Sequence, residues 1–275
     1  MKQRVLTTFA LMPPAIYVIG WAPSWLFLAA VILTMARCLH EFSGLLRQAG
    51  FRDLRGLALV GGSLLCFVPL LSRQSQGASF YLYIVVVFFP LLLWTSALAQ
   101  KASLKEYLGT VASTLLSVVY VAVPLSCLAP LRFLDPTQGR GLMFLLFGVL
   151  WAGDIFAYLV GRSIGKHLLF PLVSPKKTVE GSAAGLAGSL LVAWALGQWY
   201  APLGGVKVAL FLGLVVAVAG QVGDLVESAF KRSANLKDSG AILPGHGGLL
   251  DRIDSLLFGA PSLWLAVGLR GFWLT

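Results

Sequence analysis

Long apolar runs are the feature that most constrains this chain. About nine of them are candidates for crossing a bilayer, near residues 5–20, 24–39, 56–72, 79–98, 108–130, 142–161, 180–199, 207–229 and 249–272. A transmembrane helix needs about 17–25 predominantly apolar residues. Only 12% of the residues are charged, against about 25% in a soluble domain. The sequence therefore predicts an all-α integral membrane protein with about nine transmembrane helices.

The basic residues between these runs predict an orientation. With the N-terminus in the cytoplasm and strict alternation, 16 of the 21 Lys and Arg residues face the cytoplasm and 5 face the outer side. This distribution follows the positive-inside rule and supports nine spans with the C-terminus outside. No convincing signal-peptide cleavage site precedes Trp21, so we expect the first helix to be retained. We expect a multi-pass protein of a bacterial-type inner membrane.

The net charge of +10 is compatible with nucleic acid, anionic lipid or a phosphorylated substrate. Nucleic acid is disfavoured because the basic residues lie in short loops between apolar runs and do not cluster on one soluble segment. The three cysteines, Cys38, Cys66 and Cys127, lie in or beside apolar runs. We interpret them as small buried hydrophobic residues, and no disulfide framework is implied.

The two halves of the chain differ in their polar residues. Residues 1–140 contain about five of the predicted helices with ordinary flanking charges, and residues 141–275 contain two long polar cytoplasmic loops, 162–179 and 231–248. Seven of the eleven acidic residues lie at or after residue 154. Since functional residues concentrate on such loops, the sequence predicts an N-terminal membrane domain (1–140) and a C-terminal catalytic domain (141–275).

Acidic residues in the second half form a pattern. Asp154 lies inside an apolar run, where a carboxylate needs a partner, a metal or a water-filled cavity. Asp224 and Glu227 are spaced i, i+3 near the end of one helix, and Asp251 and Asp254 repeat this spacing at the start of the next. Such carboxylates suit a hard divalent cation. Each alone is equally compatible with a capping or snorkelling acid.

The segment SPKKTVEG contains the first basic group. Ser174, Lys176 and the helix N-terminus opened by Thr178 and Glu180 suit phosphate oxygens, and Lys177 adds a second positive charge. The alternative is a loop that only contacts lipid headgroups.

A second basic group, Lys231, Arg232 and Lys237, leads into PGHGG at 244–248. Glycines let the backbone approach a ligand. His246, in this polar loop, is a candidate for phosphate or base contact or for proton handling, or it is an ordinary loop histidine. The chain has no G-x-S-x-G, H-E-x-x-H or Walker motif, so hydrolase, zinc peptidase and P-loop ATPase interpretations lack support.

The run from Ser228 to Asp254, which contains SAFKR, KDSG, LPGHGG and DRID, resembles the signature of the phosphatidate cytidylyltransferase (CDP-diacylglycerol synthase) family. The segments DIFAYLVGR, which starts at Asp154, and SPKKTVEG resemble the same family. The likeness is specific over about residues 150–260. Residues 1–140 resemble the family only in being hydrophobic helices.

The resemblance implies that CTP and phosphatidate give CDP-diacylglycerol and pyrophosphate. It implies a divalent metal such as Mg²⁺, with K⁺ as a second ion, and by motif position it makes Asp224 and Asp251 the metal-binding pair. The expected partners are CTP, phosphatidate in the bilayer, membrane lipids and a second copy of the chain. The expected catalytic residues are Lys177, Lys231, Arg232, Lys237, Asp238, His246 and Asp254. The expected substrate-binding residues are Asp154, Arg162, Ser174, Lys176, Thr178, Glu180, Ser228, Gly247, Gly248 and Arg252.

Three alternatives stay open. A related CTP-dependent polyprenol kinase would use the same nucleotide and metal but release CDP in place of pyrophosphate. A transporter would also carry acids inside its helices, near the membrane midplane. A non-catalytic member of the family would keep the fold without the reaction.

Overall fold

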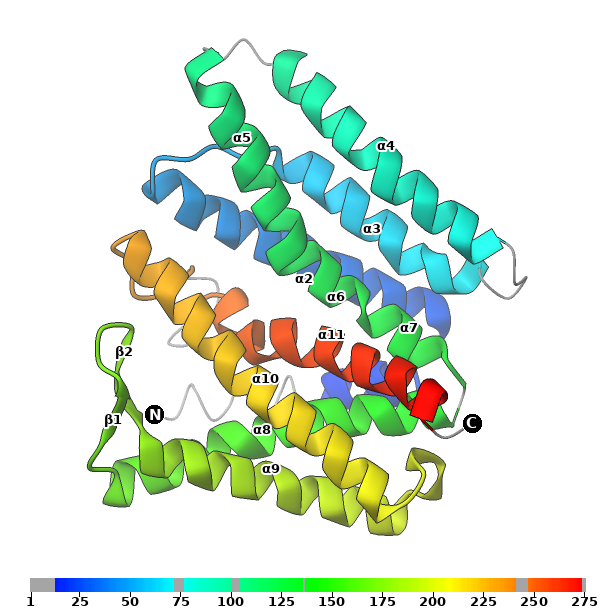
Figure 1. Cartoon of the computed structure of the whole chain (residues 1–275), viewed down its shortest axis with the longest axis vertical. Coiled ribbons are helices and arrows are strands. Elements are labelled where there is room, and N and C mark those ends of the chain that lie inside the picture. Colours follow the sequence, from blue (N-terminus) through cyan, green and yellow to red (C-terminus); the bar gives the residue numbers. More distant parts are fainter. Residues whose placement is uncertain (1–12, 72–76, 100–103, 136, 241–246, 274–275) are drawn as a thin grey trace. The chain divides into compact units, whose positions relative to one another are not determined.

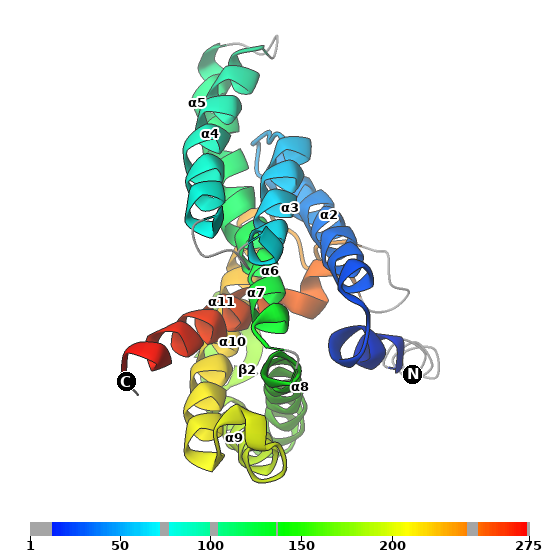
Figure 2. The ribbon, with the colours of Figure 1, turned by 90° about the vertical axis from the view of Figure 1, so that its right-hand side faces the viewer.

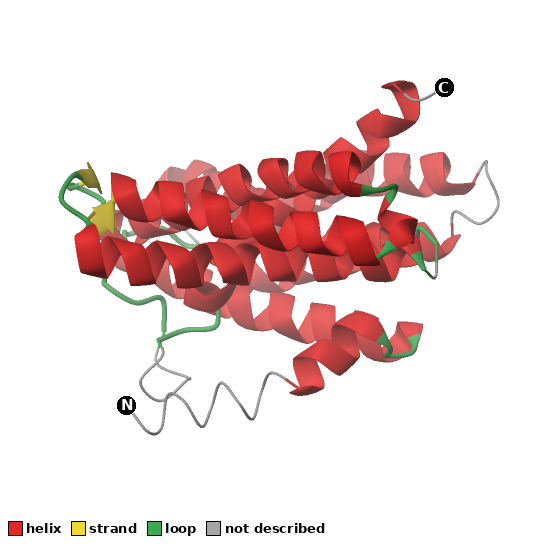
Figure 3. Cartoon of the chain, turned by 90° about the horizontal axis from the view of Figure 1, so that it is seen from below, coloured by secondary structure: helices red, strands yellow, loops and turns green. Residues whose placement is uncertain are grey.

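The protein is almost entirely helical (Figures 1 and 3) in a computed structural model that describes residues 13–71, 77–99, 104–135, 137–240 and 247–273. Residues 13–20 are helical, and the described residues of each predicted run from 24–39 onward lie almost entirely in helices, which confirms the all-α prediction. Part of the first run, 5–20, lies outside the described residues. The helices that follow residues 13–20 are α2 (Ser24–Gln48), α3 (Arg55–Leu71), α4 (Gly77–Ala99), α5 (Leu104–Ser117), α6 (Val123–Ser126), α7 (Leu128–Phe133), α8 (Gln138–Ile164), α9 (Val179–Trp199), α10 (Val206–Ser233) and α11 (Leu250–Trp273).

The apolar helices identify a multi-pass membrane protein. Within the described ranges, five segments are long and apolar enough to cross a bilayer, namely Ser24–Gln48, Leu104–Phe133, Gln138–Ile164, Val179–Trp199 and Val206–Ser233. Shorter apolar stretches lie in α3 (Arg55–Val68) and α4 (Val85–Ala99). The count of nine spans stays a prediction.

The chain forms two compact units. The first consists of Met1–Phe133 with Ser233–Arg252, and the second of Leu134–Arg232 with Ile253–Thr275. We refer to Ser233–Arg252 as the signature loop, because it carries most of the motif residues. The domain boundary predicted at residue 140 concerns function and stays a prediction.

In the first unit, α2, α3 and α4 lie side by side in chain order (Figures 1 and 2). α2 and α3 also pack closely against the segment Val118–Ala122: the rings of Phe42 and Tyr120 lie 5.0 Å apart, and a Cβ added to Gly62 would lie 2.7 Å from the Cβ of Ala122. Small residues at such positions let helix backbones approach each other.

The predicted span at 108–130 is divided into several helical segments. After α5, a π-helical turn covers Val118–Ala122, followed by α6 and α7. Pro124 is in the first turn of α6, where its missing N–H costs least. Such π turns are uncommon and often accompany functional sites. Polar residues of α5 face the 52–54 segment: the Leu54 N–H donates to Thr114 Oγ1 at 2.8 Å, and the Ser113 hydroxyl donates to the Arg52 carbonyl.

In the second unit, α8 and α9 pack closely through glycines. A Cβ added to Gly153 would lie 2.8 Å from Ser189 Oγ, and one added to Gly185 would lie 2.8 Å from the Gly153 carbonyl oxygen. The Ser189 hydroxyl donates to the Val149 carbonyl at 2.8 Å. Close backbone approach and an interhelical hydrogen bond are how membrane helices associate when the hydrophobic effect between them is absent.

A short antiparallel hairpin joins α8 to α9 within the predicted loop 162–179. Its strands are β1 (Leu168–Phe170) and β2 (Ser174–Thr178), and Leu168 pairs with Thr178 while Phe170 pairs with Ser174. Figure 3 shows these strands in yellow at the ends of the helices. The SPKKTVEG segment is therefore a strand that runs directly into α9, and Lys176 and Lys177 occupy adjacent positions on it.

Two contacts establish which segments share an end of the second unit. Arg232 Nε, at the end of α10, donates to the Val173 carbonyl of the hairpin at 3.3 Å. At the other end the Tyr200 hydroxyl donates to the Thr137 carbonyl at 2.6 Å. The hairpin and the end of α10 thus lie at one end, and the segments near 137 and 200 lie at the other.

We predict that the hairpin end faces the cytoplasm. Gln138 and Ser163 lie near opposite ends of α8, so single cysteines there report both sides with one helix. Each cysteine is introduced into protein whose Cys127 has been replaced. In intact cells a membrane-impermeant maleimide should label Gln138→Cys, and it should label Ser163→Cys only after permeabilisation. Labelling of both positions from one side would contradict the predicted orientation.

Candidate active site

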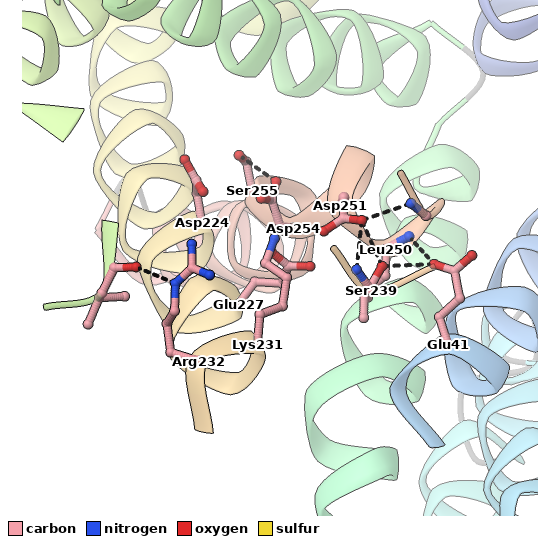
Figure 4. A network of polar contacts seen from close by, with 12 residues as sticks. Glu41, Asp224, Glu227, Lys231, Arg232, Ser239, Leu250, Asp251, Asp254 and Ser255 are labelled. Carbon is pink, nitrogen blue, oxygen red and sulfur yellow. Dashed lines mark hydrogen bonds and ion pairs between the residues drawn. The ribbon is translucent and has the colours of Figure 1, made fainter. Parts of the chain in front are cut away.

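Asp251 organises the signature loop inside the first unit. Its Oδ2 accepts hydrogen bonds from the Ser239 N–H at 2.9 Å, the Ser239 hydroxyl at 3.0 Å and the Gly248 N–H at 2.8 Å (Figure 4). These bonds join the two described arms of the loop to the start of α11. Charge-assisted hydrogen bonds of this kind are the strong ones, so one Asp251 oxygen is committed to holding the loop.

The two predicted loop glycines have structural reasons to be glycine. Gly247 has a φ of 79°, a left-handed conformation that favours glycine. A Cβ added to Gly248 would collide with Ser239 Oγ and with Glu41, a residue of α2 whose Cδ it would approach to 2.8 Å. Within the described residues the backbone at Gly248 therefore closely approaches a protein carboxylate, and its approach to a ligand stays a prediction.

The Gly248→Ala variant is expected to destabilise the loop. Overpacking a filled site costs about 1–3 kcal/mol, so the thermal midpoint in detergent should fall and activity should fall with it. Gly44→Ala is the matched control, because it lies in α2 near Glu41 with no heavy atom within 4 Å of the added Cβ. That change should be neutral or stabilising. Equal midpoints for both variants would contradict the packing argument.

The remaining charged residues of the loop are at its surface. Lys237, Asp238 and Arg252 are exposed, as groups that contact a ligand need to be. His246 lies outside the described residues, so its predicted role stays a prediction.

In the second unit, α10 brings two acid–lysine pairs to the end that carries the hairpin. Lys177 of β2 forms an ion pair with Asp224, and Lys231 forms one with Glu227 one turn below it. The Glu227 side chain is fully buried, with an exposed fraction of 0%, and that of Lys231 is 11% exposed. The sequence predicted Lys177, Asp224 and Lys231 as site residues; the structure adds that two acids of α10 are already paired with lysines.

Asp254 joins these acids because α10 and α11 are in close contact. A Cβ added to Gly223 would lie 2.8 Å from the Asp254 carbonyl oxygen. The charges of Asp224, Glu227 and Asp154 all act on the Asp254 carboxyl group. Figure 4 shows Asp224, Glu227 and Asp254 beside one another. Four carboxylates and two lysines therefore gather in one unit, with an excess of two negative charges when all are ionised.

Hydrogen bonds fix the hairpin onto α9. Thr178 caps the helix by accepting from the Gly181 N–H at 3.1 Å, the role expected for a threonine at that position. Glu180 reaches back to His167, whose Nδ1 lies 2.6 Å from its Oε1, and to the N–H groups of Lys166 and His167. Glu180 thus contacts the hairpin itself, and His167 is a partner that the sequence did not single out.

Asp154 belongs to the carboxylates around Asp254, and the remaining predicted site residues are dispersed over the second unit. Asp154 is exposed on α8, Arg162 donates to the Tyr158 hydroxyl at 2.8 Å, and Ser228 is buried in α10. Lys176 is exposed and Ser174 is half-buried on β2. Nothing in these contacts assigns them a ligand.

Gln221 is a polar residue of α10 that sequence reasoning missed. It pairs with Ser182 of α9 twice, since its amide nitrogen donates to the Ser182 carbonyl at 3.0 Å and its carbonyl accepts from the Ser182 hydroxyl. The signal for it in the sequence is an uncharged amide inside the apolar run 207–229.

No group of three or more His, Cys, Asp and Glu side chains is arranged to hold a metal ion among the residues that the structure describes. Mg²⁺ commonly takes only one or two protein carboxylates, with water and substrate phosphates as its other ligands. The carboxylates around Asp224 are chemically suited to that use.

Comparison with known proteins settles the family. A model of the cytidylyltransferase family matches residues 2–269. The chain belongs to the cytidylyltransferase family. This confirms the resemblance seen in the sequence and extends it, because the family match covers the N-terminal helices as well as the motifs.

Three relatives within the cytidylyltransferase family are proteins named phosphatidate cytidylyltransferase. Those of Staphylococcus aureus strain COL, Staphylococcus saprophyticus and Staphylococcus epidermidis strain RP62A are 44%, 43% and 42% identical to this chain over 151 residues. The matched residues are 54% of this chain and 56% of each relative. The chain thus spans about half the length of the relatives that it matches.

Proposed function

We propose that this protein is a phosphatidate cytidylyltransferase, which converts CTP and phosphatidate to CDP-diacylglycerol and pyrophosphate. The observation that carries the proposal is the 44% identity over 151 residues to a protein of that name. The signature residues between Ser228 and Asp254 support the same reaction, since they include the acids and bases that such chemistry needs.

The reaction is nucleotidyl transfer. A phosphatidate oxygen forms a new bond to the α-phosphorus of CTP, the bond between the α-phosphorus and the bridging oxygen breaks, and pyrophosphate leaves. The nucleophile is already an anion, so no strong general base is required. The protein must hold the two phosphates together and offset their charge.

The lysines of the second unit are suited to offsetting that charge. Lys177 and Lys231 are each held beside a carboxylate, Asp224 and Glu227 respectively. These ion pairs orient the ammonium groups in the absence of substrate. An arriving polyphosphate would compete for Lys177, whose side chain is 27% exposed, more readily than for Lys231, whose side chain is 11% exposed.

We also propose that the reaction uses Mg²⁺. Carboxylate oxygens are its preferred protein ligands, and Asp224 and Asp251 are the residues that the motif designates. Bound Mg²⁺ would supply Lewis-acid stabilisation of phosphate charge. On the same family basis we propose that K⁺ is a second ion and that the other motif residues contribute to catalysis or substrate binding. The same basis suggests a homodimer in a bacterial-type inner membrane.

Phosphatidate would enter sideways from the bilayer. Asp154 is exposed on α8, and Ile155, Phe156 and Leu159 of the same helical segment are exposed apolar residues. A lipid with a charged headgroup and acyl chains needs both kinds of surface close together. A reaction at the ends of membrane helices is compatible with a lipid substrate that enters from the side.

The decisive experiment is a product assay. Purified protein in detergent with Mg²⁺, phosphatidate and CTP labelled at the α-phosphorus should form labelled CDP-diacylglycerol, and γ-labelled CTP should give labelled pyrophosphate. Supplying polyprenol in place of phosphatidate tests the kinase alternative, which would release CDP and transfer the γ-label to lipid. No product with either lipid would overturn the proposal.

A test of the charge-offsetting role uses two neighbouring lysines. Lys177→Ala removes the half-buried ammonium paired with Asp224, and we expect turnover to fall at least about tenfold with weaker, salt-sensitive CTP binding. Lys176→Ala removes an equal charge from an exposed position and should cost less. Wild-type CTP affinity and turnover in a Lys176→Ala/Lys177→Ala double variant would show that β2 is not part of the active site.

A further inference from the structure

Glu41 is an acidic residue in the apolar helix α2 that neither the motifs nor the proposed reaction uses. It is 3% exposed, near the end of α2. Burying a carboxylate among apolar helices costs free energy, and such a residue usually has a functional role. Its partners in the first unit show what it does.

Glu41 reaches from α2 to the signature loop. Its Oε1 accepts from the Leu249 N–H at 3.0 Å, and its Oε2 accepts from the Leu250 N–H at 2.8 Å and from the Ser239 hydroxyl at 3.1 Å (Figure 4). The guanidinium of Arg37, one turn earlier, donates to Oε1 at 3.0 Å. All five residues belong to the first unit.

These contacts fix the start of α11. The first N–H groups of a helix have no partner within it, and a negative charge there is favoured by the helix dipole. Glu41 supplies both the acceptors and the charge from about two hundred residues away in the sequence. Asp251 and Arg252, which follow Leu250 directly, are oriented as a consequence.

Two glycines of the motif are shaped around this carboxylate. A Cβ added to Gly240 would lie 3.0 Å from Glu41 Oε1, and one added to Gly248 would collide with Oε2. The single proton of the Ser239 hydroxyl is shared between Glu41 and Asp251, whose carboxylate oxygens lie 3.1 and 3.0 Å from it. Ser239 therefore lies between two carboxylates, that of Glu41 from α2 and that of Asp251 from the loop itself.

We propose that Glu41 is a positioning residue for the signature loop: it holds Ser239 and the start of α11 so that Asp251 and Arg252 face substrate in a fixed geometry. The substrate-related part of this inference rests on the proposed function. The structural part, that Glu41 anchors the Leu249 and Leu250 N–H groups, can be measured without any activity.

The test combines hydrogen–deuterium exchange with kinetics. In Glu41→Gln, an NH₂ group that can only donate replaces one of the two carboxylate oxygens, and the negative charge is lost. Exchange at the amides of Leu249 and Leu250 should therefore accelerate at least about tenfold, as expected for loss of charged hydrogen bonds. Turnover should fall by a similar factor while the KM for CTP changes less than threefold. Glu106→Gln is the matched control, since Glu106 pairs with Arg52 on the exposed surface of the same unit.

The outcomes separate the two claims. Faster exchange at Leu249 and Leu250 with slower turnover supports the inference, and exchange at α3 and α5 that matches wild type shows that the unit is folded. If Glu41→Gln does not fold, Glu41→Asp carries the test, because its shorter side chain keeps the charge but cannot reach both N–H groups. Unchanged exchange, or faster exchange with wild-type turnover, would overturn the inference. If wild-type protein makes no CDP-diacylglycerol, the proposed function fails, and the exchange data alone decide whether Glu41 anchors the loop.

Discussion

Asp224→Asn should lower the rate of CDP-diacylglycerol formation to about a hundredth of wild type or less, the scale of effect expected when a group that stabilises transition-state charge is removed. The amide keeps the shape of the side chain but loses the charge that pairs with Lys177 and that a metal would need. The measurement is initial rate at saturating Mg²⁺, with insertion checked by yield from membranes. A rate above about a tenth of wild type would mean that Asp224 is not a metal ligand.

Asp135→Asn is the control for that substitution. Asp135 is exposed, and its Oδ1 accepts from the N–H groups of Thr137 and Gln138 at the start of α8. A hydrogen bond from the Thr137 hydroxyl at 2.6 Å, together with those two N–H groups, holds the pKa of the Asp135 carboxyl below its usual range. Asparagine caps a helix about as well as aspartate. The same chemical change at this position should leave turnover within about twofold of wild type.

Asp251→Asn should also lower turnover by orders of magnitude, because it removes both a proposed metal ligand and an anchor of the signature loop. Asp251 Oδ2 accepts from the Ser239 and Gly248 N–H groups, and an amide can present its nitrogen there in place of an acceptor. Loop exchange should therefore accelerate in Asp251→Asn and stay at the wild-type rate in Asp224→Asn. This contrast would distinguish loss of a loop anchor from loss of charge alone.

The helices could be predicted from the sequence because membrane solvation imposes a simple rule on local composition. The ends could not be predicted as well. The run predicted at 24–39 continues as α2 to Gln48. The last turns of α2 carry polar residues such as Arg47, so they do not continue the apolar pattern that marks the run. The hairpin at 168–178 was predicted as a loop because strands this short leave little periodicity to detect.

The candidate site could be predicted only in part, for a reason that Glu41 illustrates. Motif reasoning finds residues that share a local pattern, such as Asp224 with Glu227, but a partner from a distant helix leaves no pattern. Glu41 lies just after the predicted run 24–39 but inside α2, so the rule that an acid inside an apolar run needs a partner covered Asp154 and did not cover Glu41. The N-terminal helices also contain no motif that would mark Glu41. Lys177 with Asp224 is likewise a tertiary pair, which sequence spacing does not reveal.

The buried pair of Glu227 and Lys231 gives the largest expected effect on stability. The two side chains are i, i+4 on α10 and are 0% and 11% exposed. Removing one partner of a buried pair leaves an uncompensated charge and costs about 3–5 kcal/mol. Lys231→Met should therefore lower the thermal unfolding midpoint in detergent by about 10 °C. Lys237→Met, which removes an exposed lysine, should leave the midpoint unchanged.

A second substitution separates the structural role of Lys231 from its proposed catalytic one. Glu227→Gln in the Lys231→Met background removes the buried negative charge as well, so most of the lost stability should return, because apolar or neutral replacement of a whole buried pair is often nearly neutral. Turnover should not return, since the ammonium that offsets substrate phosphate is still missing. Recovery of both stability and turnover would make Lys231 a purely structural residue. A Lys231→Met midpoint equal to wild type would instead show that Glu227 is not held as a buried charge.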